Sequence, residues 1–224
     1  MSYLYDPFSA VPGFDLGARI RSRASDCGIA LTDAAVSALA EHARAVLREN
    51  EQLHLTTITE PEEFLERHLG EAFEGAAMLP QDIEGLLLDL GSGNGYPGLV
   101  LGAARPGLLP VLAEASVRKA AFLRAVIRDA GFPSAVVLEA QIQRAADLEG
   151  DGPFRLITTR ALSGWPKILP RLRSCLVERG DFLVWTGDEM ETISRREVWK
   201  KLRLEQKHPL PTREQSWIWR FRCA

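Results

Sequence analysis

One stretch, residues 86–104, limits the possible folds of this 224-residue chain more than any other feature. It reads LLLDLGSGNGYPGLVLGAA: an apolar run, a carboxylate, three glycines at alternate positions, and a second apolar segment of helical character. A buried strand that turns sharply through glycines into a helix is the first unit of a doubly wound α/β sheet. Ligands of such sheets bind beyond the carboxyl ends of the strands, so this turn is the expected ligand site.

The rest of the chain repeats this alternation of strand and helix. Short apolar runs, typical of strands buried on both faces, occur at 86–90, 109–113, 134–139, 154–159 and 181–185. The clearest intervening helix covers Ser116–Ala130, with Ser116 as its N-cap and Gly131 just past its end. Two tail strands, 203–208 and 216–222, are expected to form an antiparallel hairpin at the sheet edge. We therefore predict an α/β, Rossmann-like, doubly wound and mostly parallel seven-stranded sheet.

Helical patterns precede the first strand. From Thr32, apolar residues recur at helical spacing along one face, and a capping box at Thr59-Glu60-Pro61-Glu62 starts a second helix that would bury Phe64 and His68. We expect an N-terminal helical cap over residues 28–84, joined in one compact unit to a ligand-binding domain over 85–224. Residues 1–27, rich in Pro, Gly, Ser and Arg at their start, are expected to form a loosely attached arm.

Composition narrows the class of protein. Hydrophobic residues make up 46% of the chain, which is enough for a substantial core, and no apolar stretch is long enough to cross a membrane. The N-terminus lacks the pattern of a secretory signal. The three cysteines lie far apart without metal-ligand spacing. We expect a soluble, cytoplasmic, monomeric protein that binds neither a membrane nor a metal.

Charge is unevenly distributed along the chain, although the net charge is only −3. Residues 1–85 carry 6 Lys and Arg against 15 Asp and Glu, whereas residues 190–224 carry 9 against 4. Two interpretations stay open: the basic tail brings a polyanion to one face, or both regions are ordinary solvated helix faces.

Two cofactors compete for the glycine turn. GNGYPG, from Gly93, satisfies the dinucleotide fingerprint G-x-G-x-x-G, but it starts late relative to the strand end. From Asp89 the pattern is D-x-G-x-G-x-G, which resembles the first motif of class I methyltransferases that use S-adenosylmethionine (SAM). A carboxylate beside the turn repels a pyrophosphate and suits the cationic SAM. Glu114, 23 residues after Gly91, ends the second strand, where an acidic side chain receives ribose hydroxyls. We therefore predict SAM rather than NAD.

Four segments extend the similarity beyond the superfamily: HLTTITEPEEFLERHLGEA (54–72), LDLGSGNGYPGLVLGAARP (88–106), RKAAFLRAV (118–126) and ITTRAL (157–162). Together they resemble the bacterial ribosomal RNA small-subunit methyltransferase G family, also called glucose-inhibited division protein B. The resemblance covers roughly residues 28–190 and implies methyl transfer from SAM to guanine N7 in 16S ribosomal RNA, free or within the small ribosomal subunit. Guanine N7 has a free lone pair and loses no proton on methylation, so no general base is required.

The resemblance also assigns site residues. It implies a cofactor site that comprises Asp89, Gly91, Gly93, Gly95, Tyr96, Glu114, Ile142, Gln143 and Arg160. Glu114 would hold the ribose, and Ile142 and Gln143 would flank the adenine. On the substrate side it places His54, His68, Arg118 and again Arg160. Each of the last three has a structural alternative: a satisfied core histidine for His68, a solvated face for Arg118, and a surface or helix-capping arginine for Arg160.

This chain departs from the family pattern mainly on the substrate side. His54-Leu55-Thr56 replaces N-L-T, Glu71 and Glu114 replace aspartates, Gln141 and Gln143 replace an arginine and a glutamate, and Trp185-Thr186-Gly187 lacks the lysine of L-K-G. Two alternatives therefore remain beside the ribosomal RNA enzyme: a diverged methyltransferase of the same fold acting on another RNA or a small molecule, and a SAM- or RNA-binding module without catalysis.

Overall fold

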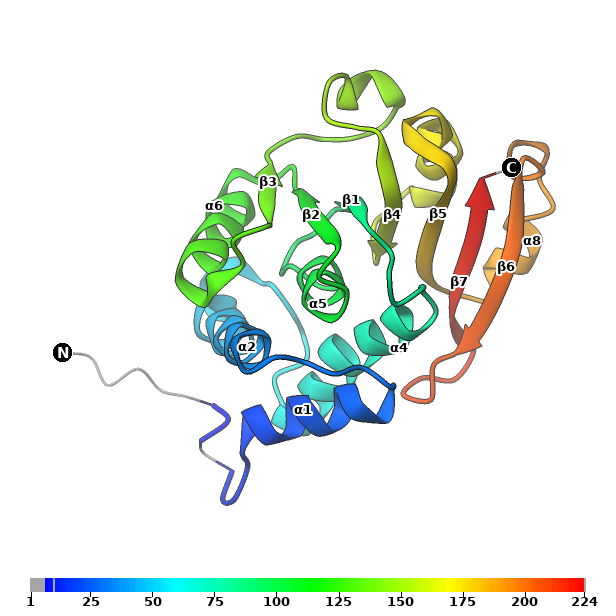
Figure 1. Ribbon diagram of the computed structural model, residues 1–224. Helices are drawn as coiled ribbons and strands as arrows, with labels where there is room; N and C mark the ends of the chain where they lie inside the picture. The colour runs from blue at the N-terminus through cyan, green and yellow to red at the C-terminus, as the bar shows by residue number, and fades with distance from the viewer. Residues whose placement is uncertain (1–6, 10, 224) are drawn as a thin grey trace.

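Seven strands form one sheet in the order β3-β2-β1-β4-β5-β7-β6 in the computed structural model, which describes residues 7–9 and 11–223 (Figure 1). The strands are β1 (Gly85–Leu90), β2 (Leu108–Ala113), β3 (Val136–Leu138), β4 (Phe154–Arg160), β5 (Leu176–Gly187), β6 (Leu202–Pro209) and β7 (Ser216–Cys223). Strands β1 to β5 are parallel, and β7 runs antiparallel to both β5 and β6. The predicted sheet, including its tail hairpin, is confirmed.

Two strands differ in length from the prediction. Strand β3 spans three residues where six were expected, because it lies at the edge of the sheet and pairs only with β2. Strand β5 begins at Leu176 rather than at 181, because Leu176 already pairs with Phe154 of β4 before a register shift, and pairing with β7 starts only at Asp181. The pattern of apolar residues alone does not predict which residues pair with a neighbouring strand.

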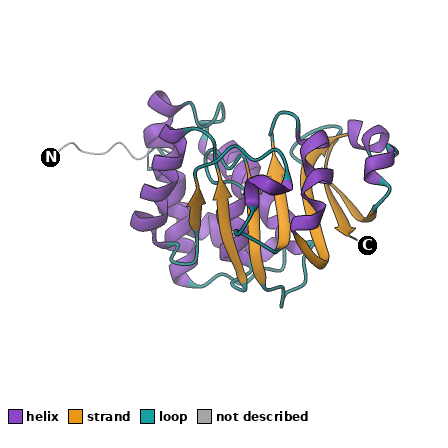
Figure 2. Cartoon of the chain, turned by 90° about the horizontal axis from the view of Figure 1, so that it is seen from above, coloured by secondary structure: helices purple, strands orange, loops and turns teal. Residues whose placement is uncertain are grey.

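Helices cover both faces of the sheet (Figure 2). One layer contains α1 (Leu16–Asp26), α2 (Asp33–Leu53), α3 (Pro61–Phe64), α4 (Glu71–Ala77), α5 (Gly98–Ala104) and α6 (Val117–Val126). A π-helical turn, Leu65–Gly70, joins α3 to α4, and another, Ile127–Gly131, extends α6. The other layer contains α7 (Trp165–Ile168), α8 (Glu189–Ile193) and the 3₁₀ turns Ala145–Leu148, Leu169–Cys175 and Glu197–Trp199.

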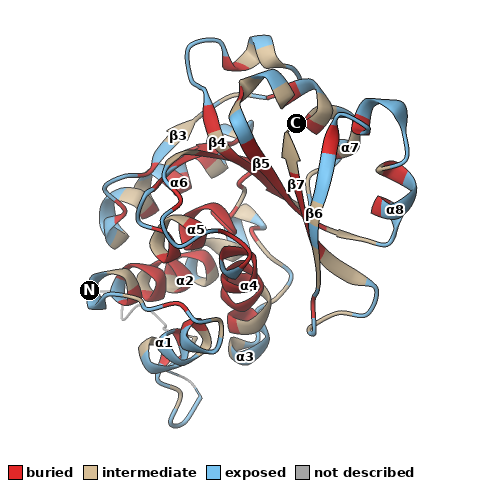
Figure 3. Cartoon of the chain, turned by 45° about the vertical axis from the view of Figure 1, so that its right-hand side comes forward, coloured by how far each residue is buried: buried red, intermediate tan, exposed pale blue. Residues whose placement is uncertain are grey.

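Alternate residues of the strands face the two layers. Leu87 and Leu183 belong to the core under the first layer, whereas Leu88 and Val184 belong to the core under the second. This division places α2, α4 and α5 on one side of the sheet and α7 and α8 on the other (Figure 3). The carboxyl ends of β1, β2, β4 and β5 share one edge, where the functional site lies. No helix within the described ranges is long and apolar enough to cross a bilayer.

The expectation of a loosely attached arm is wrong for residues 16–26, which form α1. Asp15 caps this helix by accepting a hydrogen bond from the Ala18 N–H at 2.9 Å, and Ile20 and Ala24 are fully buried. Residues 1–6 and 10 of the expected arm lie outside the described residues. The apolar stripe that buries α1 has only three members among polar and basic neighbours, so overall composition concealed it.

The start of α3 lies one residue beyond the expected capping box. Glu60, not Thr59, is the N-cap, and its carboxylate accepts from the Glu63 N–H at 2.8 Å. Pro61 occupies the first helical position, where its missing N–H costs nothing, and this fixes Glu60 as the cap. The predicted cap Ser116 of α6 is confirmed, with its hydroxyl accepting from the Lys119 N–H at 3.5 Å.

Candidate functional site

The glycine turn follows β1 and is anchored to the end of β2. The Gly91 and Ser92 N–H groups donate to the Ala113 carbonyl at 2.9 and 3.1 Å. All three glycines adopt positive φ, at 67° for Gly91, 53° for Gly93 and 91° for Gly95. Residues other than glycine rarely adopt positive φ, so this backbone conformation favours glycine at positions 91, 93 and 95.

The glycines serve different purposes. A Cβ on Gly91 would lie 2.8 Å from Leu162 Cδ1, so Gly91 allows the loop to pack against the segment after β4. A Cβ on Gly93 would meet nothing nearer than the Gly91 carbonyl oxygen at 3.8 Å. Gly93 therefore presents bare backbone to open space, as a loop must where a ligand approaches closely.

Asp89 supports the turn from within the protein. It is 1% exposed, and its Oδ2 accepts from the Gly98 N–H, at the start of α5, at 3.2 Å. Burial raises the pKa of the Asp89 carboxyl to about 6, while bonds from Ser92 and Gly98 oppose the rise. Asp89 thus fixes the turn relative to α5 and does not line the cavity described below.

Glu114 lies across the turn at the end of β2. Its Oε2 accepts from the Gly93 N–H at 2.9 Å and its Oε1 from the Ser116 N–H at 2.7 Å. The carboxylate therefore bridges the glycine turn and the start of α6. Ile142 and Gln143 follow β3: Ile142 is buried, whereas Gln143 is exposed and its N–H donates to Asp147 Oδ2 at 2.9 Å.

A cavity of about 430 Å³ adjoins the glycine turn. Its walls come from the segment after α2, the cap helices, the glycine turn, the ends of β4 and β5, and the β6–β7 turn. Predicted site residues that line it are Gly91, Gly93, Tyr96, His68 and Arg160. Segments more than 100 residues apart in the chain thus meet around one space beside the turn.

His68 lies between a hydroxyl and a guanidinium. Arg160 Nη2 is 2.7 Å from His68 Nδ1, and Thr56 Oγ1 is 2.8 Å from His68 Nε2. Because a guanidinium can only donate, Nδ1 accepts and Nε2 carries the proton that is donated to Thr56. Burial, with the Arg160 charge, lowers the pKa of His68 to about 2, so the ring is neutral. Both interpretations of His68 are compatible with the structure, because the ring is buried with both nitrogens hydrogen-bonded and also lines the cavity.

Glu71 is the centre of a buried charge network. Its carboxylate is fully buried, accepts from Arg213 Nε and Nη2 at 3.0 and 2.9 Å, and accepts from the Thr212 hydroxyl at 2.7 Å. Arg160 Nη1 lies 3.6 Å from Glu71 Oε2 and donates to the Arg67 carbonyl at 2.7 Å. The network joins the cap, the end of β4 and the β6–β7 turn. Arg160 is thus a buried network member rather than a surface arginine.

Tyr96 stacks between two histidines. Its ring centroid is 4.3 Å from that of His42 and 5.1 Å from that of His68. The Tyr96 hydroxyl is buried and has no hydrogen-bond partner among the described residues. Burial raises the pKa of this phenol, so it is a neutral donor beside the cavity. His42 Nε2 donates to the Asn94 carbonyl at 2.6 Å and so fixes the turn from below.

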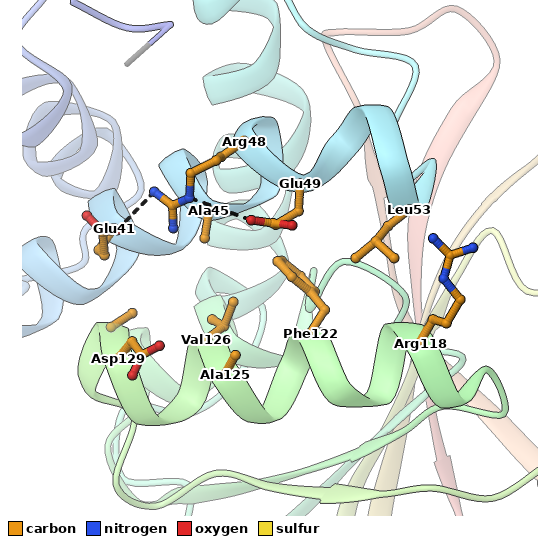
Figure 4. Close-up of a pocket in the computed structure, with 11 residues that line it drawn as sticks. Glu41, Ala45, Arg48, Glu49, Leu53, Arg118, Phe122, Ala125, Val126 and Asp129 are labelled. Atoms are coloured by element: carbon orange, nitrogen blue, oxygen red, sulfur yellow. Dashed lines mark ion pairs between the residues drawn. The ribbon is translucent and has the colours of Figure 1, made fainter. Parts of the chain in front are cut away.

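Two predicted substrate residues do not line this cavity. His54 is exposed and ends α2 in the left-handed conformation, with φ 48°. Arg118 donates to the Gln52 carbonyl at 2.8 Å and borders a different hollow, about 360 Å³ in volume, between α2 and α6 (Figure 4). Among the described residues, no three His, Cys, Asp or Glu side chains are placed to hold a metal ion.

Glu71, Thr212 and Arg213 were not among the predicted site residues. Arg213 and Glu71 are 142 positions apart, so no local pattern links them. The position of Glu71 next to the R-H-L segment was the only available signal, and an arginine in a polar turn offers none.

Comparison with known sequences gives one family. The model of the family described as rRNA small subunit methyltransferase G matches residues 35–214. The protein named ribosomal RNA small subunit methyltransferase G from Sorangium cellulosum is 36% identical over 152 residues, covering 66% of this chain and 62% of that protein. The protein of the same name from Acinetobacter baumannii is 28% identical over 193 residues, covering 82% of this chain and 90% of that protein.

Solved structures share the fold at low sequence identity. A ribosomal protein L11 methylase from Lactobacillus delbrueckii subsp. bulgaricus aligns with a TM-score of 0.58 and 16% identity, covering 70% of this chain and 80% of that one. Fibrillarin from Aeropyrum pernix, with natively bound S-adenosyl-L-methionine, aligns with a TM-score of 0.51 and 15% identity, covering 64% and 68%. The chain therefore has the fold of known methyltransferases.

Proposed function

The chain belongs to the ribosomal RNA small subunit methyltransferase G family, and on that premise we propose that it transfers a methyl group from SAM to guanine N7 in 16S ribosomal RNA. Membership makes it a SAM-dependent methyltransferase. The proposal rests on one observation: the glycine turn, with its backbone open at Gly93, lies beside a cavity that is lined by the largely buried Arg160 and a neutral histidine.

The residues of the turn fit SAM. Gly93 leaves backbone open on the ligand side, and residues 91–104, which form the turn and the following helix, contain no Lys or Arg to attract a pyrophosphate. We assign Glu114 to the ribose hydroxyls, in exchange for its bond to the Gly93 N–H, and Ile142 and Gln143 to the adenine. Tyr96 and Gly91 would contact the donor, while Asp89 and Gly95 hold the turn in shape. When bound, SAM supplies a methyl group on a sulfonium.

The cavity is assigned to the acceptor base. Guanine N7 attacks through its own lone pair, so the protein needs to orient the base and exclude water rather than remove a proton. Neutral His68 and the buried Arg160 guanidinium are positioned for this orientation, and Glu71 holds Arg160 in place. His54 and Arg118, outside the cavity, are assigned to contacts with RNA around the target base.

The same proposal covers the protein's setting. We assign residues 28–84 to a helical cap and 85–224 to the SAM-binding domain, with α1 packed against the cap. The protein would act as a monomer in the cytoplasm, on free 16S RNA or on the small ribosomal subunit.

Two measurements test this function. Calorimetry should detect SAM binding and no NAD binding, and the absence of SAM binding would refute the assignment. Tritiated SAM should then label 16S RNA or 30S subunits, with the label recovered as 7-methylguanosine after nuclease digestion. Label only on another RNA or on small molecules would favour a diverged enzyme of the same fold. SAM binding without transfer to any acceptor would favour a binding module.

A further inference from the structure

Two segments on the α7–α8 side of the sheet carry a strong excess of positive charge. Residues 163–175 contain Lys167, Arg171 and Arg173 and no acidic residue. Residues 195–203 contain Arg195, Arg196, Lys200, Lys201 and Arg203 against the single carboxylate of Glu197. All eight cationic side chains are exposed except that of Arg173, which is half-buried. We call the surface formed by these two segments the basic face.

The two segments are held together as one surface. Trp199 is 1% exposed, and its indole N–H donates to the Pro166 carbonyl at 3.1 Å. The Trp165 and Trp199 rings meet edge to face at 5.9 Å. Helices α7 and α8 accordingly lie on the same side of the sheet, away from the cap (Figure 3). The two basic segments are therefore held in fixed positions by packed tryptophan side chains.

Most cations of the basic face form no ion pair with another described residue, the exceptions being Lys200 and Arg203. In the part of the chain that the structure describes, no carboxylate lies within 4 Å of Lys167, Arg171, Arg173, Arg196 or Lys201. On the cap side, by contrast, ion pairs join Arg19 to Glu62, Arg21 to Asp33, Arg23 to Glu66 and Arg67 to Glu63. An ordinary solvated face carries both positive and negative side chains, as the cap side does. Within the two basic segments the cations outnumber the carboxylates by eight to one, although Asp188, Glu189 and Glu191 lie between the segments in the chain.

The basic face begins at the rim of the cavity. Ala161 and Glu189 line the cavity, and they lie just before α7 and at the start of α8. Each basic segment follows one of these rim residues in the chain and then leads away from the cavity. Leu176, just after the first segment, pairs with Phe154 at the start of β4. Arg203, in the second segment, pairs with Arg222, which lies opposite Asp181 rather than the carboxyl end of β5. An RNA whose target base occupies the cavity would therefore reach the basic face along α7 and α8, toward the opposite edge of the sheet.

We propose that the basic face binds the sugar–phosphate backbone of the RNA substrate as it leads away from the target base. The inference rests on the proposed function, because it takes the polyanion to be the RNA whose guanine enters the cavity. Lysine and arginine contacts to phosphate release counterions, so they position a nucleic acid and make its binding depend on salt.

The test neutralises five of the six basic-face cations that form no ion pair with a described residue, in the variant K167Q/R171Q/R173Q/R196Q/K201Q. A matched control neutralises five half-exposed or exposed arginines elsewhere, R19Q/R21Q/R124Q/R128Q/R144Q. Filter binding to 16S RNA is measured across a salt series, with steady-state methyl transfer and SAM calorimetry in parallel. We expect the basic-face variant to raise the KM for RNA at least tenfold and to flatten the slope of log K against log salt by about 3–4. Its SAM affinity and kcat should stay within about twofold of wild type.

The outcomes separate the two proposals. If the wild-type protein transfers no methyl group to 16S RNA, the proposed function fails, and the salt-dependent RNA binding of the two variants still decides the docking proposal. If the basic-face variant binds RNA as the control does, the docking proposal fails while the function stands. Unchanged RNA binding together with lost binding to phosphatidylserine vesicles would assign the basic face to an anionic membrane and overturn the proposal.

Discussion

The glycine turn and the cavity wall lie side by side but are built differently. The turn is formed by consecutive residues, 89–98, whose positive φ values and close contacts specify it locally. The wall joins His68 and Glu71 to Arg160 and Arg213 through charged groups up to 142 positions apart. The donor side therefore depends on backbone shape and open space, whereas the acceptor side depends on long-range electrostatics that folding must assemble. A change in the turn should therefore affect mainly SAM affinity, whereas a change in the cavity wall should affect mainly the free energy of unfolding.

The largest effect is expected from Gly93→Leu. The side chain would fill the open space beside the turn, so SAM affinity should fall at least about 100-fold, or about 2.7 kcal/mol. The left-handed backbone costs about 1–2 kcal/mol of stability. Gly131→Leu is the control, because Gly131 also has positive φ, at 88°, and open space but lies at the end of α6. Calorimetry with SAM would contradict the account if both variants bound alike.

Glu71→Ala should lower the free energy of unfolding rather than SAM affinity. Removing the buried carboxylate leaves Arg160 and Arg213 without their acceptor, so the free energy of unfolding should fall by about 3–5 kcal/mol. Urea titration measures this loss, and SAM affinity of the folded fraction should change less than threefold. A loss below about 1 kcal/mol would show that the network does not hold the wall together.

Lowering the pH should destabilise the protein. The pKa values of His42 and His68 are lowered to about 4 and about 2 in the folded protein. Below pH 6.5 these histidines are therefore protonated in the unfolded chain but neutral in the folded one, and the unfolded state is favoured. Each histidine costs about 2 kcal/mol between pH 8 and pH 5. Asp89, with its pKa raised to about 6, has the opposite sign and offsets about 1.4 kcal/mol between pH 8 and pH 5. Urea titrations should show a net loss of about 2–3 kcal/mol.

The histidine origin of this loss can be checked with His42→Gln. Glutamine keeps a donor for the Asn94 carbonyl but does not titrate. The pH dependence of the unfolding free energy should therefore weaken by about one proton between pH 5 and 6.5. An unchanged slope would place the titrating groups elsewhere.

The smallest effect is expected on the cap surface. Arg19 and Glu62 form an ion pair at 3.0 Å with side chains 52% and 48% exposed. Arg19→Gln should change the free energy of unfolding by less than about 1 kcal/mol and leave SAM affinity unchanged. A loss comparable to that of Glu71→Ala would remove the contrast between buried and exposed charge.

The same contrast explains how far the sequence alone could reach. The turn from Asp89 to Gly98 was predictable because its motif, its strand and its helix are contiguous. Helix α1 was missed because Leu16, Ile20 and Ala24 form a short stripe in a polar segment. Arg213 was missed because only the folding of the tail hairpin brings it to Glu71. His54 and Arg118 were assigned by resemblance, and the path of α2 and α6 leaves both outside the cavity.

The central claim, that the turn holds the donor and the cavity holds the acceptor base, is tested most directly with Arg160→Gln. Arg160 lines the cavity, and its hydrogen bonds go to His68 and the Arg67 carbonyl, whereas it acts on Asp89 and Tyr96 of the glycine turn only through its charge. The account predicts a SAM Kd within about threefold of wild type and a single-turnover rate of methyl transfer to 16S RNA at least about 100-fold lower. A folded variant that loses SAM binding, or one that transfers at the wild-type rate, would contradict it.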